Sequence, residues 1–491
     1  MQRSFYWHDY ETFGIDPQRD RPAQFAGLRT DEALRPIGDP LVVYCRPADD
    51  YLPQPEACLI TGITPQLARE RGLPEAEFIA RIHDELAKPG TCALGYNTLR
   101  FDDEVTRNTL YRNLYDPYAR EWQNGNSRWD LIDVTRLTRA LRPAGIEWPD
   151  HADGTPSFRL EDLTAANGIE HGAAHDALAD VQATIALARL IRKRQGKLFD
   201  YVYTHRDKRH LSAELDPARA KPVVHVSARY PATRGCLAVV IPLAWHPVNR
   251  NAVIVYDLSA DPEALLTLDA GAIRERLFTT AEQRPEGSER IPLKLVHINK
   301  APVIVPYATL RAEDAERLGI DRVQCEANHA LIASGPPLTA KLHAVFETPD
   351  WEPHNDPDLM IYSGGFFNDA DRARMDQIRV AAPEQLARMA PSFDDPRLPE
   401  MLFRYRARNY PNSLSATERT RWQAWRRERL LGSAEQAESP LTAYRGQLAV
   451  LRSREAGNAA HLAIIDALET YCDELAATLP TTTPPLMPSK M

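Results

Sequence analysis

The sequence predicts an α/β protein of more than one domain, and three observations support that class. Short apolar runs alternate with amphipathic helical segments as far as residue 196. β-Branched runs then dominate residues 222–306, and helical periodicity dominates the chain beyond a Pro/Asp-rich linker at 348–358. The length of 491 residues exceeds what one core of ordinary size uses, so two to four domains are expected.

The first domain is expected over residues 1–196. Its first three strands are predicted at 4–8, 25–29 and 41–45, because each run is apolar and is bounded by polar or proline-containing turns. A helix with clear apolar spacing follows at 74–88. The remaining elements of this domain are a strand at 91–97 and helices at 102–115, 128–141, 157–168 and 174–195.

The second domain is expected over 197–350 as a small, barrel-like β domain. Its strands correspond to the runs PVVHVS, CLAVVIPLAW, NAVIVYDL, LKLVHI and APVIVP. Asn299 and Lys300 are expected to form a tight hairpin between the last two strands, and a helical insertion is expected at about 262–283. A third, helical domain is expected over 353–480, followed by a proline-rich, disordered tail at 481–491.

The composition is that of a folded protein outside the membrane. Hydrophobic residues make up 43% of the chain and charged residues 26%. No run reaches the roughly 18 apolar residues that a membrane span requires, and the N-terminal segment lacks a signal-peptide pattern. The six cysteines are scattered without paired or C-x-x-C spacing, which indicates reduced thiols and a cytoplasmic location.

The distribution of charge favours a nucleic-acid partner more than the net charge does. The net charge of −9 argues mildly against such a partner. However, residues 189–210 and 402–430 each contain eight Lys/Arg against two acids, a local charge of +6. The second stretch includes FRYRARNYP, in which aromatic residues suited to base stacking alternate with arginines suited to phosphate contacts. The alternative for either stretch is an ordinary solvated helix face.

An acidic pair interrupts the apolar first strand. In WHDYETFG, Asp9 and Glu11 project to one face of the strand, while His8 and Tyr10 project to the other. Two adjacent carboxylates repel each other, and burying them without partners costs several kcal/mol. Two ways of resolving this remain open. Either the pair binds a divalent cation such as Mg²⁺ or Mn²⁺, or it pairs with arginines.

Two later stretches supply further candidate ligands. GYNTLRFDDE places Asp102 at a helix start, and HGAAHDALADV places His175 five residues before Asp180 on a long helix. Each has a structural alternative, since Asp102 would serve as a helix cap, His175 as a loop residue and Asp180 as a solvent-facing acid. In this order, however, D-x-E, Asp and H-x-x-x-x-D resemble the DEDDh 3′→5′ exonuclease superfamily, whose fold is ribonuclease-H-like.

The resemblance is closer to the bacterial exonuclease I family and extends over nearly the whole chain. It is carried by HDYETFG, DRPAQFAGLRTD, GYNTLRFDDEVTRN, SFRLEDLTAANGIEH, AHDALADV, PLAWHPVNRNAVI, VHINKAPV and YRARNYP. The family plan implies a DEDDh exonuclease domain, an SH3-like β domain with an insertion, and a C-terminal helical domain. It also implies digestion of single-stranded DNA from the 3′ end to 5′-mononucleotides, in DNA repair or recombination.

The resemblance assigns the active-site roles residue by residue. It implies that two Mg²⁺ ions, with Mn²⁺ as an alternative, are bound by Asp9, Glu11, Asp102 and Asp180. His175 is implied as the general base, and His171 is ranked well below it because it lies outside the H-x-x-x-x-D spacing.

Further residues are candidates for contacts with the substrate. Thr12 and Phe13 follow the acidic pair and are expected to meet the terminal sugar and base. Arg159 is expected to contact a phosphate, with a helix-surface ion pair to Glu161 or Asp162 as the alternative. The approach of the strand is expected to be lined by Arg107, Tyr118 and Trp122, although Trp122 also suits a core position.

The family also implies a protein partner, the acidic C-terminal tail of single-stranded DNA-binding protein. Its pocket is expected to include Arg142, Tyr201 and Arg311, while Pro306 stands where a polar side chain is expected. We expect a monomer that does not bind membranes. Two other functions remain open from the sequence: a DEDDh exonuclease acting on RNA, and a catalytically silent scaffold that binds single strands.

Overall fold

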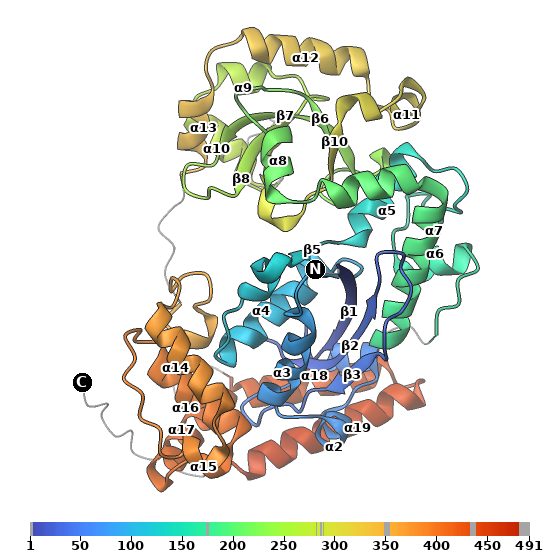
Figure 1. Cartoon of the computed structure of the whole chain (residues 1–491). Coiled ribbons are helices and arrows are strands. Elements are labelled where there is room, and N and C mark those ends of the chain that lie inside the picture. Colours follow the sequence, from blue (N-terminus) through green and yellow to red (C-terminus); the bar gives the residue numbers. More distant parts are fainter. Residues whose placement is uncertain are drawn as a thin grey trace.

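The computed structural model describes residues 3–172, 176–280, 282–284, 287, 289–347, 354–432 and 438–480. The tail at 481–491 and His175 lie outside these described residues. Figure 1 shows three parts. An α/β first domain lies in the centre, a β domain lies above it, and helices from the last third of the chain lie below and to one side. The predicted α/β class with an added β domain and helical domain is therefore confirmed.

The first domain is built on a mixed five-stranded sheet with the order β3-β2-β1-β4-β5. β2 pairs antiparallel with both β1 and β3, whereas β4 runs parallel to both β1 and β5. Both faces of β1 are buried, because Phe5 and Trp7 enter one apolar cluster while Tyr6 and Tyr10 enter another. The strands are β1 (Ser4–Thr12), β2 (Pro22–Thr30), β3 (Leu41–Tyr44), β4 (Thr91–Leu94) and β5 (Ser127–Arg128).

Helices cover the two faces of this sheet. On the Trp7 face lie α5 (Leu131–Leu141), α6 (Leu160–Ala166) and α7 (Ala177–Thr204). On the Tyr10 face lie α3 (Glu75–Leu86) and α4 (Asp102–Arg112). α7 continues through a kink at Gln195, so the helix extends past the domain end expected at 196. Two short helices, α1 (Pro55–Thr61) and α2 (Pro65–Arg71), face the C-terminal helices.

The β domain contains one antiparallel five-stranded sheet with the order β10-β6-β7-β8-β9. The strands are β6 (Val223–Val226), β7 (Leu237–Trp245), β8 (Ala252–Asp257), β9 (Leu293–His297) and β10 (Ile304–Pro306). The predicted helical insertion between β8 and β9 is confirmed as α9 (Glu263–Thr267) and α10 (Ala270–Phe278). The other helices of this domain are α8 (Lys208–Glu214), α11 (Ala312–Arg317), α12 (Arg322–Ser334) and α13 (Thr339–Val345).

The hairpin expected at Asn299 and Lys300 is wrong. β9 pairs with β8 while β10 pairs with β6, so these two strands lie at opposite edges of the sheet. The connection is a 3₁₀ turn, Ile298–Lys300, followed by Ala301 with φ of 41°. Consecutive strands usually pair, but a small curved sheet brings its two edges together, and a short turn then joins edge to edge.

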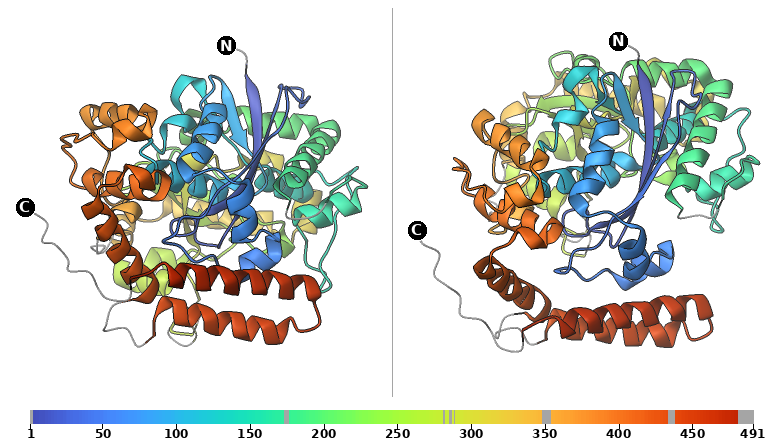
Figure 2. Two further views of the ribbon diagram at one scale, coloured as in Figure 1. Left: turned by 90° about the horizontal axis from the view of Figure 1, so that it is seen from below. Right: turned by 60° about the horizontal axis from the view of Figure 1, so that its bottom comes forward.

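The helical domain consists of α14 (Asp369–Val380), α15 (Pro383–Leu386), α16 (Leu398–Asn409), α17 (Ala416–Leu431), α18 (Pro440–Arg454) and α19 (Ala459–Ala477). α18 and α19 form a long hairpin that lies beneath the first domain (Figure 2). Its apolar face packs on α1 and α2. No helix in the described segments is both long and apolar enough to cross a bilayer.

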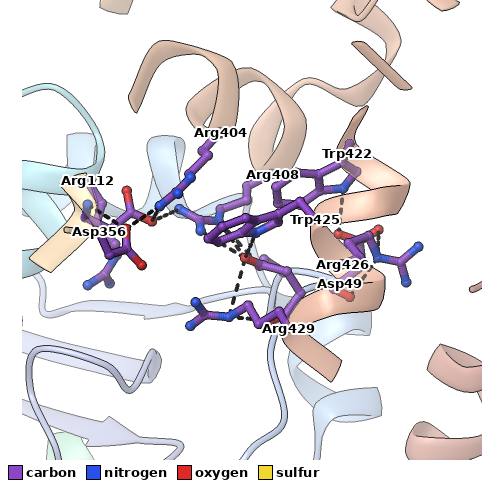
Figure 3. Close-up of polar contacts among 12 residues, drawn as sticks. Asp49, Arg112, Asp356, Arg404, Arg408, Trp422, Trp425, Arg426 and Arg429 are labelled. Carbon is purple, nitrogen blue, oxygen red and sulfur yellow. Dashed lines mark hydrogen bonds and ion pairs between the residues drawn. The ribbon is translucent and has the colours of Figure 1, made fainter. Parts of the chain in front are cut away.

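The exposed basic surface expected over residues 402–430 is only partly present, because Arg419 and Arg421 are exposed while four of the other arginines are not. Arg404, Arg406 and Arg426 are buried, and the Arg408 side chain is only 5% exposed. They pair with acids of their own helices, of the 356–358 segment and of the 49–50 loop of the first domain (Figure 3). Acids far away in the sequence neutralise this stretch, so its local charge was a poor guide to exposure.

Candidate active site

The acidic pair lies near the end of β1, against the rest of the buried strand. Asp9 and Glu11 alternate with His8 and Tyr10, whose rings pack among the aromatics of the opposite face. Glu11 is buried, and Asp9 is partly buried. β1 therefore holds two carboxylates on one face at the edge of the core.

Two helices bring the other two acids to this strand. Asp102 begins α4, and its Oδ1 accepts a hydrogen bond from the Tyr10 N–H at 3.0 Å. Asp180 lies in the first turn of α7, which packs on β1. One carboxylate oxygen from each of Asp9, Glu11 and Asp180 lies within 4.8 Å of the others. Three of the four acids expected from the sequence thus meet within this distance, and Asp102 lies close enough to raise the pKa values of Asp9 and Glu11.

Burial and mutual repulsion raise the pKa values of three of these acids. Burial and then the carboxylates of Asp180 and Asp102 raise the pKa of Glu11 to about 8. Burial is also the largest cause that raises the pKa of Asp102 to about 8, while the hydrogen bond from Tyr10 opposes it. Burial, followed by Asp102, Glu11 and Asp180, raises the pKa of Asp9 well above its usual range.

The donor set fits hard divalent cations. Within the described residues, no basic side chain forms an ion pair with Asp9, Glu11 or Asp102, so the arginine-paired alternative is excluded there. Carboxylate oxygens are the ligands that Mg²⁺ and Mn²⁺ prefer, and a cation would offset the mutual repulsion. The alternative that Asp102 serves only as a helix cap is wrong, because Phe101 holds the cap position of α4 and the Asp102 carboxylate lies close enough to raise the pKa of Asp9.

A histidine does lie against the acids, but it is not the one favoured by spacing. His171 Nε2 is 2.5 Å from Asp180 Oδ1, and His171 Nδ1 is 3.1 Å from Thr164 Oγ1. The position of His175 cannot be compared with it, because His175 lies outside the described residues. The sequence signal for His171 was weak, since it lies outside the H-x-x-x-x-D spacing.

The two residues after the acidic pair face different surroundings. Thr12 Oγ1 donates to the Gly14 carbonyl oxygen at 2.7 Å, which fixes the turn that follows β1. Phe13 is 1% exposed and packs next to Tyr51 in the cluster shared with the C-terminal helices. In this arrangement the Phe13 ring is part of the core, whereas a contact with a terminal base requires it to face the acids.

A large cavity of about 1600 Å³ lies between the three parts of the molecule. Its basic lining comes from all of them: Arg3, Arg100, Arg107, Arg128, Arg206, Lys208, Lys300 and Arg372. Tyr118 and Trp122, two of the residues expected to line the approach, also lie on its wall. Trp122 is 66% exposed, so the alternative that it belongs to the core is wrong.

Arg107 lines the cavity, as expected, but acidic side chains already bind its guanidinium. It is buried, and its guanidinium donates to Glu121 at 2.7 and 2.9 Å and to Glu104 at 2.8 Å. Glu104 also accepts from the Tyr362 hydroxyl and lies 3.8 Å from Lys300. Arg107 therefore ties α4 to its neighbours, and the exposed cations of the cavity come from other positions.

The cavity also contains an aromatic side chain that sequence reasoning missed. Phe366 is 84% exposed and lies edge-on to Tyr118, with ring centroids 5.8 Å apart. Arg397 donates to the Gly365 carbonyl at 3.0 Å and packs over Phe367, so the loop turns Phe367 inward and Phe366 outward. The available sequence signal was the pair of phenylalanines that follows two glycines in SGGFF. Glycine permits the positive φ of 74° that Gly365 adopts in this loop.

Arg159 stands at the start of α6, outside the cavity wall. Its side chain is exposed, and within the described residues it forms no ion pair with Glu161 or Asp162. Asp162 instead accepts from Ser157 Oγ at 2.5 Å. The ion-pair alternative is therefore not realised there, and Arg159 remains a candidate for a phosphate contact.

The three candidate partner residues lie where α5 and α7 meet the β domain. Arg142 donates to Asp314 at 3.1 Å and to the Thr309 carbonyl oxygen at 3.2 Å. Arg311 pairs with Glu313 at 3.2 Å, and after burial its charge is the next cause that lowers the pKa of Arg142. Tyr201 stacks on His205 at 4.0 Å. The two arginines are thus brought close together, each with an acid of α11 already in place.

Comparisons with family models and with known proteins show what this chain is similar to. Three family models match: Exonuclease over residues 6–188, Exonuclease I SH3-like domain over 206–348, and Exonuclease I C-terminal domain over 355–475. The chain is 51% identical to exodeoxyribonuclease I of Escherichia coli, covering 97% of this chain and 98% of that protein.

Two solved structures extend the comparison. The zinc-bound form of the E. coli ExoI–ssDNA complex matches with a TM-score of 0.92 and 51% identity, covering 97% of this chain and 100% of that one. An SSB/Exonuclease I structure with the inhibitor CFAM matches with a TM-score of 0.88 and 50% identity over the same shares of the two chains.

Proposed function

The chain belongs to the exonuclease I family and is an exodeoxyribonuclease that acts on single-stranded DNA; on that premise we propose that it removes 5′-mononucleotides from the 3′ end with two divalent ions. The observation that carries this proposal is the convergence of Asp9, Glu11, Asp102 and Asp180 from three separate elements. The raised pKa values of Asp9, Glu11 and Asp102, and the absence of basic side chains paired with these three acids among the described residues, support a site that is completed by metal.

The four acids would hold the ions, and the rest of the chain prepares the substrate. Bound Mg²⁺ or Mn²⁺ supplies stabilisation of the negative charge on the attacking and leaving oxygens of the phosphodiester. β1 and α4 fix Asp9, Glu11 and Asp102 relative to one another through the core and the Tyr10 N–H. We assign the removal of a proton from the attacking water to His175, on the spacing of the H-x-x-x-x-D motif.

The cavity supports a preference for single strands. Trp122 and Phe366 offer exposed rings from two different domains, and base stacking on an aromatic ring is worth about 1–3 kcal/mol whatever the base. The surrounding cations provide phosphate contacts that depend on salt and not on sequence. Because three parts of the chain border the cavity, we propose that the strand stays enclosed between cuts and that digestion is processive.

The basic site at Arg142, Arg311 and Tyr201 is our candidate for the tail of single-stranded DNA-binding protein. The SSB/Exonuclease I structure supports such a partnership in the family. Asp314 and Glu313 already pair with the two arginines, so an acidic tail has to compete with them. A role in repair or recombination, a monomeric state and a cytoplasmic location remain predictions, and the six free thiols fit the last of them.

The test of the proposed function is an end-labelling assay. Single-stranded DNA labelled at the 3′ end is expected to release a labelled mononucleotide at once, whereas DNA labelled at the 5′ end releases its label only from fully digested chains. Chelation of divalent ions is expected to stop both. Early release from the 5′ end, or full activity in chelator, contradicts the proposal, and preferential digestion of an RNA of the same sequence would favour the RNA alternative.

A further inference from the structure

His171 occupies a well-defined place beside the acids. Its Nε2 lies 2.5 Å from Asp180 Oδ1 and its Nδ1 lies 3.1 Å from Thr164 Oγ1, so both ring nitrogens have a partner. The side chain is 10% exposed, although it follows α6 in a stretch without regular secondary structure. A largely buried imidazole held at both nitrogens has one orientation, and that orientation presents Nε2 to a carboxylate.

The partner on the far side of the ring is itself fixed. Thr164 is fully buried on α6, and its Oγ1 lies 2.9 Å from the Leu160 carbonyl oxygen. A carboxylate oxygen only accepts, so the proton of the contact with Asp180 has to lie between Nε2 and Oδ1. The threonine hydroxyl can act toward Nδ1 as donor or acceptor, so it supports this contact with a neutral or a charged ring. α6 packs against α7, which completes a rigid frame from Thr164 to Asp180.

Asp180 differs from the other acids in how it is held. Asp102 is fixed by the backbone of Tyr10, and Asp9 and Glu11 are fixed by a buried strand. Asp180 comes from another element, and its carboxylate is repelled by the two acids that lie within 4.8 Å of it. Among the described residues, His171 is the only side chain that bonds to the Asp180 carboxylate.

We propose that His171 is a positioning residue, which holds Asp180 toward Asp9 and Glu11 through the Thr164–His171–Asp180 chain and so preorganises the metal site. This inference rests on the proposed function, because it gives the four acids the role of metal ligands. Residues that orient a metal-ligating side chain typically contribute 10–100-fold in metal affinity, which sets the size of the expected effect at about that range. It assigns His171 no proton transfer to or from the substrate.

The test is a titration of the metal-free, full-length protein with Mn²⁺, followed by the paramagnetic resonance signal of the free ion. His171→Ala is expected to weaken Mn²⁺ binding about 10–100-fold. His171→Gln keeps an N–H near the place of Nε2 and is expected to restore most of the affinity. Thr164→Val removes the support at Nδ1 and is expected to weaken binding by a smaller factor, about threefold to tenfold.

The chain offers a matched control for the threonine. Thr138 on α5 is also fully buried and bonds to its own helix, at 2.7 Å from the Val134 carbonyl oxygen, but no histidine of the described segments bonds to it. Thr138→Val is therefore expected to bind Mn²⁺ like the wild type. Thermal unfolding of each variant identifies any loss of fold. If His171→Ala does not fold, the Mn²⁺ affinities of the glutamine variant and the two valine variants test the proposal.

Three results would overturn the inference. One is wild-type Mn²⁺ affinity in His171→Ala with reduced turnover at saturating Mn²⁺, as expected of a general base. Another is a glutamine variant as weak as the alanine variant, and the third is tighter binding without the imidazole. A wild-type protein that binds no Mn²⁺ contradicts the proposed function itself, so failure of the two proposals can be told apart.

Discussion

Alternation along β1 makes the acidic pair chemically useful. Tyr6, His8 and Tyr10 bury their rings on one face, and this packing holds the strand rigid. Asp9 and Glu11 on the other face then lie at a fixed separation, although like charges so close together resist burial. At the scale of single residues, the account requires that each carboxylate contributes a ligand and that its charge matters more than its shape.

Replacing one acid by its amide tests this requirement. Asp9→Asn keeps the size of the side chain but removes a charged ligand, and we expect turnover to fall at least about a thousandfold, which corresponds to about 4 kcal/mol of transition-state stabilisation. Binding of single-stranded DNA is expected to survive. The measurement is nucleotide release under single-turnover conditions, together with a filter-binding assay.

Asp176 provides the matched control. It lies close enough to raise the pKa of Glu11, yet its carboxylate caps α7 by accepting from the N–H groups of Leu178 and Ala179. Asparagine caps a helix about as well as aspartate, so Asp176→Asn is expected to stay within about threefold of wild-type turnover. Equal losses in the two variants would mean that general negative charge, and not ligation, explains the effect.

The raised pKa values predict how metal stabilisation depends on pH. The pKa of Glu11 is about 8 in the folded protein, against about 4.3 in an unfolded chain. Between these values the folded state holds a proton that the unfolded chain has lost, so this group makes the metal-free protein less stable as pH rises. Mg²⁺ requires the ionised carboxylates and replaces their protons, so the increase in Tm on adding Mg²⁺ is expected to be larger at about pH 8 than at about pH 6.

Differential scanning calorimetry with and without Mg²⁺ at the two pH values measures this difference. Glu11→Gln removes the titrating carboxyl and is expected to flatten the pH dependence and to reduce the Mg²⁺ effect. A Tm increase that is equal at both pH values, or larger at the lower one, would contradict the assignment of the cluster as a metal site.

At the scale of elements, a buried ion-pair network attaches α16 and α17 to the first domain. Arg408 lies between two buried acids, at 2.9 Å from Asp50 and 2.8 Å from Asp358. Burial alone would raise the pKa of Asp50, but the guanidiniums of Arg408 and Arg429 outweigh it and hold that pKa well below its usual range. The network therefore supplies stability that is present above about pH 4 and is lost as pH falls.

Removal of the central cation predicts a large loss of stability. Arg408→Met leaves Asp50 and Asp358 without their shared partner, and breaking a buried pair in this way costs about 3–5 kcal/mol. Urea unfolding measures the loss. Arg445→Met removes the pair that Arg445 forms with Asp473 near the surface, at 2.7 Å, and is expected to cost less than about 1 kcal/mol. Similar small losses in both variants would show that the network is not what attaches these helices.

The elements also show which parts of the fold could be predicted from the sequence. Apolar runs and helical spacing found β1, α3 and α7, which bury one or both faces in a regular pattern, while the acidic start of its segment found α4, which is buried almost throughout. These local signals could not show that Arg408 of α16 and Arg426 of α17 pair with Asp50 and Asp49, since that pairing depends on tertiary contacts across more than 350 residues. The edge-to-edge connection of β9 and β10 was missed for the same reason, because sheet closure is not a local property.

At the scale of the whole molecule, both added domains are joined to the first through continuous apolar clusters. One cluster runs from the α5 and α7 side of the first sheet into the β domain, and two others join the first domain to the C-terminal helices. The cavity between the three parts therefore has walls of defined structure. Its exposed aromatics come from domains far apart in sequence. Trp122 was a candidate because it follows a helix of the exonuclease domain, whereas nothing local connected Phe366 of the helical domain to this wall.

Enclosure of the strand predicts a specific loss when the stacking surface is removed. Phe366→Ala is expected to lower the number of nucleotides removed per binding event several-fold. The lost stacking contact is worth about 1–3 kcal/mol, and its loss speeds dissociation of the strand. Cleavage of a dinucleotide too short to reach this wall should change little. The measurement is the product distribution on a long single strand with an excess of unlabelled trap.

Phe278 is a suitable control for this substitution. It is also an exposed phenylalanine, at 60%, but it lies on α10 and does not line the cavity. Phe278→Ala is expected to leave the run length unchanged. If both variants shorten the runs equally, or neither does, the path proposed for the strand is wrong.

The most direct measurement of the central claim is anomalous diffraction from a crystal of this protein soaked in Mn²⁺. The account predicts two anomalous peaks bounded by the carboxylates of Asp9, Glu11, Asp102 and Asp180, and their loss in Asp9→Asn crystals treated in the same way. Mn²⁺ bound elsewhere, with none at these four carboxylates, would contradict the account, because these side chains would then not be metal ligands.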